Sequence, residues 1–406
     1  MSQIKLKLED IEKAQHILQE FLEPTPLLLN SWISEKLNCK VYLKLENMQP
    51  IGSFKIRGAT NKIASLSAAE RKKGIVAASA GNHAQGVAWG AKKFKTKATI
   101  VMPENASLTK IQNTKALGAE IVLSGENYEQ AYTVAMDLVK KTKAVFVHAY
   151  EDPYVIAGQG TAGLEILKQL PDVDVVIGSI GGGGLMCGVG TAVKSIRPQT
   201  KIIGSQAHGA NCVIQSFRNK KIISTKTADT FADGIKTIST SPAMFNILNS
   251  LLDEAYDAED ELIAASVLML LEKAKVVAEG AGALPLAILS KHKNHFRGKK
   301  VVLLISGGNI DVNLVSRIID RGLIQNGRRV RLNVFIPDKP GSLSQLTSII
   351  ANNGGNVLQV IHDRDSPGVG IHETNVELTL ETKGHQHSKQ IVQALKHHVL
   401  KLTFLH

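Results

Sequence analysis

Apolar residues follow one repeated pattern from about residue 74 to residue 322. A short run rich in β-branched residues is followed by a turn of small residues and then by a longer stretch with helical periodicity. Because the runs are apolar throughout, we expect parallel sheets covered by helices on both faces. The predicted strands are residues 74–79, 98–102, 120–123, 144–147, 173–177, 201–204 and 300–305. This order predicts an α/β fold.

A second pattern begins after a predicted helix at residues 312–322. The polar, turn-rich stretch 325–329 follows this helix and marks a domain boundary. We therefore expect a first domain over 1–322, a linker over 323–329 and a second domain over 330–406. The second domain reads in order as strand 330–336, helix 342–352, strands 356–362 and 372–380, helix 388–397 and a final strand. This βαββαβ order is typical of a ferredoxin-like fold.

Composition narrows the class of protein. The 406 residues are 44% hydrophobic and 21% charged, as in soluble globular proteins. The N-terminus lacks the apolar core of a signal peptide, and no apolar run approaches the length of a membrane span. The net charge of +12 comes from scattered lysines, which favours a solvated surface over a nucleic-acid site. We expect a cytoplasmic protein with no membrane or nucleic-acid partner.

Cysteine and histidine positions argue against a metal site. The three cysteines, Cys39, Cys187 and Cys212, are too widely spaced for a disulfide framework or a metal quartet. Six histidines between residues 362 and 398 lie on different predicted elements without fixed spacing, so solvated surface side chains are the favoured interpretation. We expect no bound metal.

Three loops that follow predicted strands have unusual sequences. They read Ser-Ala-Gly-Asn-His at 79–83, Gly-Gly-Gly-Gly-Leu at 181–185 and Ser-Gly-Gly-Asn at 306–309. In open parallel sheets, ligands bind beyond the carboxyl ends of the strands, so these loops are candidates for the chemistry. The glycine loop at 181–185 also precedes a predicted helix, and its backbone N–H groups suit a dianionic phosphate.

The glycine loop does not match the nucleotide-binding patterns. A dinucleotide motif of the form G-x-G-x-x-G needs a third glycine where Met186 or Cys187 stands, and Gln206 occupies the place of the acid that binds a ribose. The chain also has no G-x-x-x-x-G-K-[ST] motif. A nicotinamide cofactor is therefore disfavoured.

Lys55 stands at the start of a predicted helix, after the turn residues Pro50 and Gly52. A positive charge at a helix N-terminus is unfavourable, which lowers proton affinity in the way that a covalent cofactor lysine requires. An ordinary exposed lysine is the alternative. The local sequence leaves both interpretations open.

Four motifs in one order resemble the pyridoxal-phosphate (PLP) enzymes of fold type II. They are Ser-Phe-Lys-Ile-Arg-Gly-Ala at 53–59, Ser-Ala-Gly-Asn-His-Ala-Gln-Gly at 79–86, and the loops at 181–185 and 306–309. Within that group the chain is most similar to the threonine dehydratases, also called threonine ammonia-lyases, over about residues 5–322. The resemblance implies a tryptophan synthase β-like fold with two open parallel-sheet subdomains, the smaller over roughly 50–150.

The resemblance implies roles for the residues that would hold PLP. Lys55 would form the Schiff base and exchange a proton with the substrate Cα, and Phe54 would pack on the cofactor ring. Asn82 would bind the ring 3-oxygen, and Ser306 the ring nitrogen. A neutral hydroxyl leaves that nitrogen largely unprotonated, which suits elimination better than transamination. Glu279 matches a family acid near the ring, although an exposed loop carboxylate is the alternative. The implied phosphate ligands are Gly181, Gly182, Gly183, Gly184 and Leu185.

The loop at 79–83 is implied to bind the substrate carboxylate. Its residues are Ser79, Ala80, Gly81, Asn82 and His83, and the last three open a helix with free N–H groups. We assign His83 a structural role, since a histidine in a first helical turn is more often a packing or capping group and Lys55 already supplies a base.

The implied activity is loss of water from L-threonine, giving 2-oxobutanoate and ammonia, and also from L-serine, giving pyruvate. Related racemases have a serine in the place of Ala80, so we expect poor racemisation. Gln206 replaces the glutamate with which some relatives bind a divalent cation, so we expect no such site. A serine-preferring dehydratase, a serine racemase and a catalytically silent amino-acid sensor remain as alternatives.

The C-terminal domain resembles an ACT domain, a small ligand-sensing module. The resemblance rests on its βαββαβ order and on the turn at 338–343. Gly341 and Ser342 open a helix whose backbone donors suit an effector carboxylate. An amino-acid or nucleotide effector is thus one possibility, and a dimerisation module without a ligand is the other. The family implies a homodimer or homotetramer.

Overall fold

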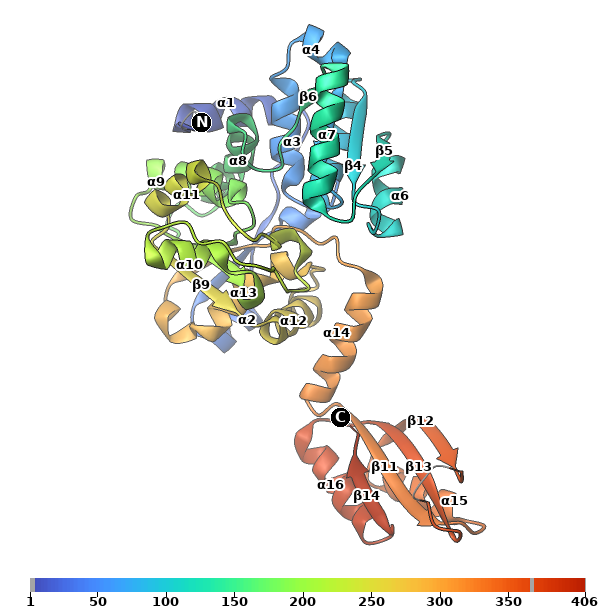
Figure 1. The fold of residues 1–406 in the computed structure, drawn as a ribbon. Helices are drawn as coiled ribbons and strands as arrows, with labels where there is room; N and C mark the ends of the chain where they lie inside the picture. The colour runs from blue at the N-terminus through green and yellow to red at the C-terminus, as the bar shows by residue number, and fades with distance from the viewer. Residues whose placement is uncertain (1–3, 366–368, 406) are drawn as a thin grey trace. The chain divides into compact units, whose positions relative to one another are not determined.

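The computed structural model describes residues 4–365 and 369–405 (Figure 1). The chain divides into two compact units, Met1–Ile310 and Asp311–His406, which we describe separately. Helix α14 (Val312–Gln325) belongs to the second unit, to which it is joined by a short turn before β11 (Arg329–Pro337). The division therefore falls before the helix that the sequence analysis assigned to the first domain, and the expected boundary at 323–329 stays a prediction.

The larger sheet of the first unit has six strands. Their order is β1 (Leu27–Leu29), β2 (Lys40–Lys44), β10 (Lys300–Leu304), β7 (Val175–Ser179), β8 (Lys201–Ala207) and β9 (Glu254–Ala258). Five strands are parallel, as predicted, but the edge strand β1 is antiparallel to β2. Strands β1, β2 and β9 were not predicted from the sequence, because β1 is very short and the other two carry charged residues.

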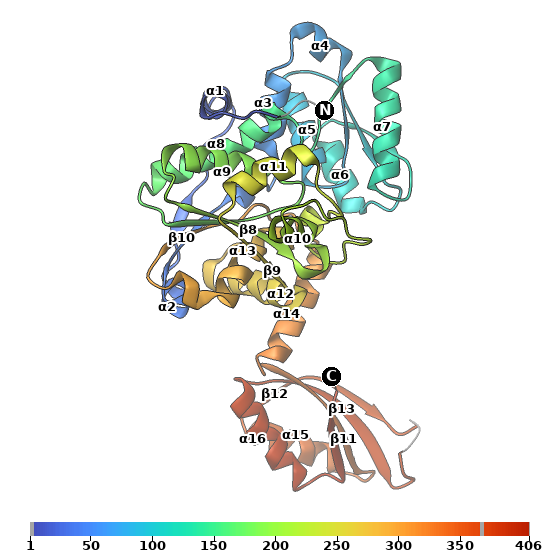
Figure 2. The same ribbon diagram turned by 60° about the vertical axis from the view of Figure 1, so that its left-hand side comes forward.

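Helices cover both faces of the larger sheet (Figure 2). Helices α8 (Pro153–Gln169) and α9 (Gly184–Ile196) lie on one face, and α12 (Asp260–Met269) and α13 (Gly280–Lys291) lie on the other. Most residues of α8 and α9 are buried, because the two helices pack against each other as well as over the sheet. The further helices are α1 (Leu8–Leu18), α2 (Ser31–Leu37), α10 (Cys212–Asn219) and α11 (Pro242–Leu251), with short 3-10 turns η1 (Glu46–Met48), η2 (His208–Ala210), η3 (Asp233–Ile235) and η5 (Lys293–Phe296) and the π-helical turn η4 (Leu270–Ala274).

The smaller sheet lies within the subdomain expected over 50–150. Its four parallel strands are ordered β5 (Glu120–Leu123), β4 (Ala98–Met102), β3 (Ile75–Ala78) and β6 (Val145–Phe146). Alternate residues of β3 point to opposite faces: Ile75 and Ala77 join one core, whereas Val76 and Ala78 join another that packs on α7 (Tyr128–Thr142). The other helices here are α3 (Lys55–Ala64), α4 (Ala68–Lys73), α5 (Asn82–Lys93) and α6 (Leu108–Ala116). The predicted α/β architecture is confirmed.

The second unit contains a four-stranded antiparallel sheet. The order is β12 (Asn356–Asp363), β13 (Glu373–Glu381), β11 and β14 (Lys401–Phe404). Helices α15 (Ser342–Asn352) and α16 (His385–Lys396) pack on one face, where every second residue of β11 is buried (Figure 2). The predicted βαββαβ order is confirmed, and α16 begins three residues before the expected start.

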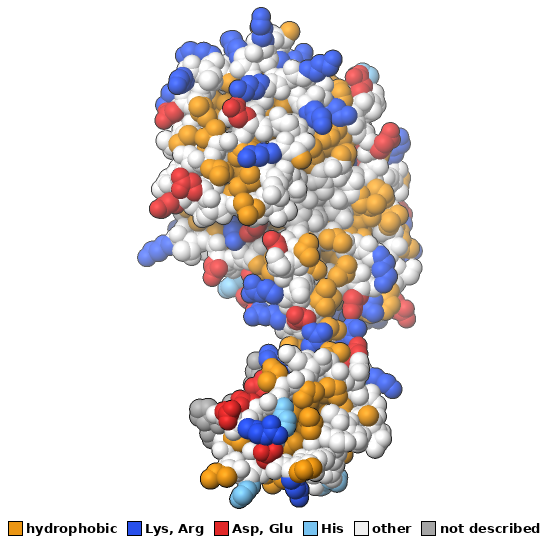
Figure 3. All heavy atoms as spheres, turned by 90° about the vertical axis from the view of Figure 1, so that its right-hand side faces the viewer, with side chains coloured by type: hydrophobic (Ala, Val, Ile, Leu, Met, Phe, Trp, Pro, Cys, Tyr) orange, Lys and Arg blue, Asp and Glu red, His pale blue; other side chains and the backbone are white. Residues whose placement is uncertain are grey.

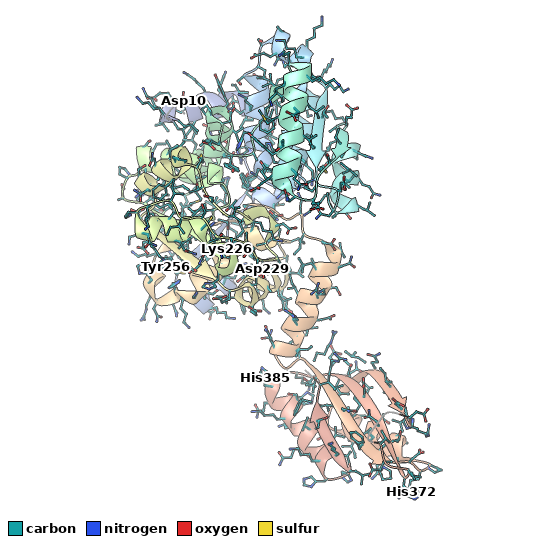
Figure 4. The ribbon with its side chains drawn as sticks, in the orientation of Figure 1. Asp10, Lys226, Asp229, Tyr256, His372 and His385 are labelled. Carbon is teal, nitrogen blue, oxygen red and sulfur yellow. The ribbon has the colours of Figure 1, made fainter. Side chains whose placement is uncertain are left out.

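Surface charge is dispersed on the face shown in Figure 3. Lysine and arginine side chains there lie among acidic and apolar ones. Figure 4 places His372 and His385 at opposite ends of the second unit. Within the described residues, no helix combines the length and the hydropathy that crossing a bilayer requires.

Candidate active site

A cavity of about 880 Å³ lies where the predicted loops meet in the first unit. Strands β3, β7 and β10 each end at this cavity, and the loop that follows each strand lines it. All the cofactor and substrate residues that were predicted in the first unit line this cavity. These residues are Phe54, Lys55, Ser79, Ala80, Gly81, Asn82, His83, Gly181, Gly182, Gly183, Gly184, Leu185, Glu279 and Ser306. Tertiary structure thus brings all four motifs together.

Lys55 is the first residue of α3 and points its ammonium group into this wall. Its Nζ donates a hydrogen bond of 2.8 Å to the carbonyl oxygen of Ala149. Burial lowers the pKa of Lys55 to about 8, and the negative charge of Glu279 opposes that change. The interpretation of Lys55 as an ordinary exposed lysine is therefore wrong, and burial is the cause of its low pKa.

The glycine loop is packed too tightly for side chains. Gly183 has a φ of 95°, in the left-handed region that favours glycine, and it caps the start of α9. A Cβ atom on Gly182 would lie 2.2 Å from Cδ1 of Tyr150, and one on Gly181 would lie 2.9 Å from the carbonyl oxygen of Gly234. The loop therefore presents bare backbone at a helix N-terminus, which fits a phosphate group.

The Ser306 loop is tied directly to the Lys55 segment. The backbone N–H of Phe54 donates to the carbonyl oxygen of Ser306 at 3.0 Å, and Ser53 forms an isolated β-bridge with Gly307. Ser306 is only 3% exposed, so its hydroxyl belongs to the cavity wall and not to the surface. A neutral hydroxyl at this place fits a ring nitrogen that carries no formal charge.

Asn82, Glu279 and Asn309 form a hydrogen-bonded chain across three loops. Asn82 Nδ2 donates to Glu279 Oε1 at 2.8 Å, and Asn309 Nδ2 donates to Asn82 Oδ1 at 2.7 Å. Burial raises the pKa of Glu279 to about 7, although the hydrogen bond from Asn82 opposes the rise. Of the two interpretations offered for Glu279, the structure supports the cavity acid over an exposed loop carboxylate.

Two family models match the chain. The model of pyridoxal-phosphate-dependent enzymes matches residues 18–307, and the ACT domain model matches residues 330–396. The chain belongs to the pyridoxal-phosphate-dependent enzymes. The glycine loop, Lys55 and Ser306 of this PLP enzyme line one cavity.

Relatives of this PLP enzyme cover nearly its whole length. The L-threonine ammonia-lyase of Thermotoga maritima is 48% identical over 390 residues, which are 96% of this chain and 97% of that protein. The L-threonine ammonia-lyase of Geobacter sulfurreducens is 40% identical over 386 residues, which are 95% of this chain and 96% of that protein.

Solved structures resemble the first unit of the PLP enzyme. The processed form of threonine deaminase isoform 2 from Solanum lycopersicum has a TM-score of 0.74 and 32% identity, covering 78% of this chain and 90% of that one. Maize serine racemase also has a TM-score of 0.74, with 33% identity, covering 79% of this chain and 98% of that one. The fold therefore agrees with fold type II but does not separate deamination from racemisation.

His83 is buried beside Lys55 in this PLP enzyme. Its Nε2 lies 2.8 Å from the carbonyl oxygen of Val147, to which it donates as the neutral tautomer. Burial, together with the positive charge of Lys55, lowers the pKa of His83 to about 3. A ring held neutral against a backbone carbonyl suits the structural role that we assigned to His83.

Many residues of the cavity wall were not predicted from the sequence, and Tyr150, Lys110 and Asp233 are three of them. Tyr150 packs against the glycine loop, while Lys110 of α6 and Asp233 of η3 form an ion pair of 2.8 Å. Tyr150 follows a predicted strand, which was a weak positional signal. Lys110 and Asp233 lie in no recognisable motif, so only the fold reveals them.

Gln206 has a structural partner in the PLP enzyme. Its Oε1 accepts hydrogen bonds from the backbone N–H groups of Val213 and Ile214 at 2.9 and 3.1 Å, in the first turn of α10. The side chain therefore satisfies helix donors that have no partner within the helix. The absence of a divalent cation at this position stays a prediction.

Proposed function

We propose that this chain is an L-threonine ammonia-lyase, which converts L-threonine to 2-oxobutanoate and ammonia. The observation that carries the proposal is the convergence of Lys55, the glycine loop and Ser306 on one cavity. Two relatives named L-threonine ammonia-lyase, similar over nearly the full chain, support the choice of substrate.

The cavity residues would hold PLP by groups suited to its parts. The backbone of the glycine loop would bind the phosphate, Asn82 the ring 3-oxygen and Ser306 the ring nitrogen, with Phe54 packed on the ring. When bound, PLP withdraws electrons from the substrate Cα, so that a proton can leave Cα and hydroxide can leave Cβ.

Lys55 would serve as the base that takes the proton from Cα. An amine with a pKa of about 8 is deprotonated in an appreciable fraction of molecules at neutral pH, whereas an ordinary lysine is almost fully charged. The buried site thus supplies a lysine that can accept a proton at Nζ. The carbonyl oxygen of Ala149 holds the ammonium form in the cavity.

The start of α5 would bind the substrate carboxylate. Gly81 is the residue before the helix, and the backbone N–H groups of Asn82 and His83 belong to its first turn. Ser79 Oγ accepts a hydrogen bond of 3.2 Å from the N–H of Gly81, which orders the turn. These free donors at the positive end of a helix suit an anion, so the carboxylate would lie beside Lys55.

Serine is a second substrate of the proposed enzyme, and racemisation is the rival reaction. A racemase needs a proton donor on the face of Cα opposite the base, and Ala80 has none to give. We therefore expect pyruvate from L-serine with little D-serine. A chiral assay that shows rapid conversion of L- to D-serine contradicts this expectation.

The second unit would sense an amino-acid or nucleotide effector. Its ACT family supports this role, and Gly341, with a φ of 94°, opens helix α15 without a close neighbour at its Cβ position. The backbone donors of Gly341 and Ser342 would bind the effector. The alternative is a dimerisation module without a ligand. We place the enzyme in the cytoplasm as a homodimer or homotetramer.

The decisive experiment is a 2-oxo acid assay on threonine and serine with the PLP-loaded enzyme. It is run with and without isoleucine, valine or AMP, so that an effector requirement does not hide activity. Formation of 2-oxobutanoate from threonine supports the proposal. If no 2-oxobutanoate forms under any of these conditions, the proposal is refuted and the catalytically silent amino-acid sensor becomes the favoured alternative.

A further inference from the structure

Four charged side chains are buried together in the first unit without lining the cavity. Lys44 and Glu46 have no exposed surface, Arg57 is 1% exposed and Glu165 is 7% exposed. Two positive and two negative groups make the set electrically neutral, and we call it the buried quartet. None of its members has a part in the function proposed above.

Arg57 is the centre of the buried quartet. Its Nε and Nη2 donate to the two oxygens of Glu46 at 2.7 and 2.8 Å. Its Nη1 and Nη2 donate to the two oxygens of Glu165 at 2.6 and 2.8 Å. Both carboxylates therefore meet the planar guanidinium in the bidentate geometry that restricts its orientation most strongly. Glu46 belongs to η1 and Glu165 to α8, so Arg57 ties α3 to two other elements.

Lys44 completes the buried quartet from the last position of β2. Its Nζ donates to Glu165 Oε2 at 2.6 Å, to the carbonyl oxygen of Thr25 at 2.7 Å and to Gln169 Oε1 at 3.0 Å. Glu165 accepts from both Lys44 and Arg57, so the quartet consists of two joined pairs, Arg57 with Glu46 and Lys44 with Glu165. Each pair is neutral by itself.

Stability alone does not explain such an arrangement. Removing four charges from water is costly, and apolar residues of similar volume often leave a protein equally or more stable. A buried ionic group does, however, allow few alternative geometries, because each donor needs its acceptor. The buried quartet therefore points to a need for one particular orientation of α3.

The position of Arg57 relative to Lys55 shows which orientation matters. The two residues are two positions apart in α3, and a helix turns by about 100° per residue, so their side chains leave the helix about 200° apart. Lys55 faces the cavity, and Arg57 faces the buried quartet on the other side. Any rotation of α3 that moves Lys55 away from the cavity pulls Arg57 out of both carboxylates.

Close packing leaves rotation as the remaining freedom of α3. A Cβ atom on Gly58 would lie 2.4 Å from Gln159 Nε2, and one on Gly158 would lie 2.7 Å from the carbonyl oxygen of Arg57. These contacts limit sliding between α3 and α8. One of them involves the end of the Gln159 side chain and the other the backbone of Arg57, and neither fixes a rotation as strongly as two bidentate carboxylates do.

We propose that Arg57 is a positioning residue, which sets the rotation of α3 about its axis and so aims the amino group of Lys55 into the cavity. The inference rests on the proposed role of Lys55 as the cofactor lysine. Arg57 itself touches neither substrate nor cofactor.

The test compares two charge-balanced double variants. A single Arg57→Met substitution would leave an uncompensated buried carboxylate and disturb folding, so each variant removes one complete pair. Arg57→Met with Glu46→Met removes the positioning pair. Lys44→Met with Glu165→Met removes an equally buried pair, and with it the contact of Arg57 with Glu165, but leaves the bidentate contact between Arg57 and Glu46.

The first readout does not depend on turnover. Each protein is mixed with pyridoxal phosphate and reduced with borohydride, and labelling of the Lys55 peptide is followed by mass spectrometry, with the Lys62 peptide as internal control. We expect labelling of Lys55 to slow by about 10- to 100-fold in the Arg57/Glu46 variant and by less than about threefold in the Lys44/Glu165 variant.

Steady-state kinetics complete the test. In the Arg57/Glu46 variant, kcat per loaded site should fall about 10- to 100-fold while KM for threonine stays within about threefold. Equal slowing of Lys55 labelling in both double variants, or labelling at the wild-type rate in the Arg57/Glu46 variant, overturns the positioning role. A wild-type enzyme that forms no 2-oxobutanoate refutes the proposed function instead, and the labelling comparison still decides the role of Arg57.

Discussion

The side-chain amide of Asn82 donates to Glu279 while its carbonyl oxygen accepts from Asn309. Asn82 is the first residue of α5, Glu279 precedes α13, and Asn309 lies in the loop after β10. Because both polar atoms of the Asn82 side chain have partners, its orientation in the cavity is fixed. The same contact holds Glu279 at the wall of the cavity that Lys55 also lines, and the protonation of Glu279 bears on stability.

The Glu279→Gln variant should show how stability depends on pH. Burial raises the pKa of Glu279 from 4.5 to about 7. Between these values the folded protein keeps a proton that the unfolded chain releases, so wild-type stability falls as pH rises. At pH 8 the neutral glutamine should be more stable than wild type by about 1–3 kcal/mol, and at pH 4.5 the gain should be much smaller.

Urea unfolding of the cofactor-free protein at the two pH values measures this difference. Asp137→Asn, a neutralisation on the exposed surface of α7, serves as control and should give no such pH-dependent gain. If Glu279→Gln stabilises the protein equally at both pH values, the pKa of Glu279 is not raised.

The Lys55→Ala variant should remove the base. We expect 2-oxobutanoate formation from threonine to fall by at least about 10²- to 10⁴-fold, because the variant lacks the amine at Nζ that would take the Cα proton. Lys62→Ala is the matched control, since Lys62 belongs to the same helix and pairs with Asp152. Circular dichroism checks that both variants are folded. Activity of Lys55→Ala within tenfold of wild type would exclude Lys55 as the essential base.

The Gly182→Ala variant should weaken cofactor binding. The added methyl group would lie 2.2 Å from Cδ1 of Tyr150, and overpacking of this kind costs about 1–3 kcal/mol, or roughly tenfold or more in affinity. Titration with pyridoxal phosphate, followed by absorbance, measures the loss. The loss of affinity caused by Gly182→Ala should be smaller when the protein already carries Tyr150→Ala, because the ring that the methyl group meets is then absent. Independent effects of the two substitutions argue against the predicted clash.

The Lys110→Ala variant should loosen the cavity. The ion pair between Lys110 and Asp233 joins α6, which follows a strand of the smaller sheet, to η3 across the cavity. Both side chains are partly exposed, so the pair is worth no more than about 1 kcal/mol, and we expect KM for threonine to rise by up to about fivefold. Added salt should reduce the difference in KM between the variant and the wild type, because it screens the ion pair.

Lys236→Ala is the control for the Lys110 experiment. Lys236 also pairs with Asp233, at 3.0 Å, but three residues along the same segment, so this pair does not cross the cavity. Its loss should change KM less than the loss of Lys110. An equal change for both variants indicates that Asp233 needs only a nearby positive charge.

Short-range patterns were sufficient for much of the fold. The strands at 98–102 and 120–123 and the helix at 342–352 have the predicted bounds. They were predictable because β-branched apolar runs and amphipathic periodicity reflect local preferences. The edge strand β1 was missed, since three residues carry too little pattern and antiparallel pairing with β2 depends on what lies beside it.

The amino-acid sequence by itself determined the elements, the glycine loop and the order of the motifs, since these follow from neighbouring residues. Only the tertiary structure decided that Glu279 is partly buried beside Asn82, that Tyr150 packs on Gly182, and that Arg57 meets a carboxylate 108 residues away in Glu165. Burial and charge pairing depend on which distant segments pack together, and they convert Lys55 from one lysine among many into an amine with a pKa of about 8.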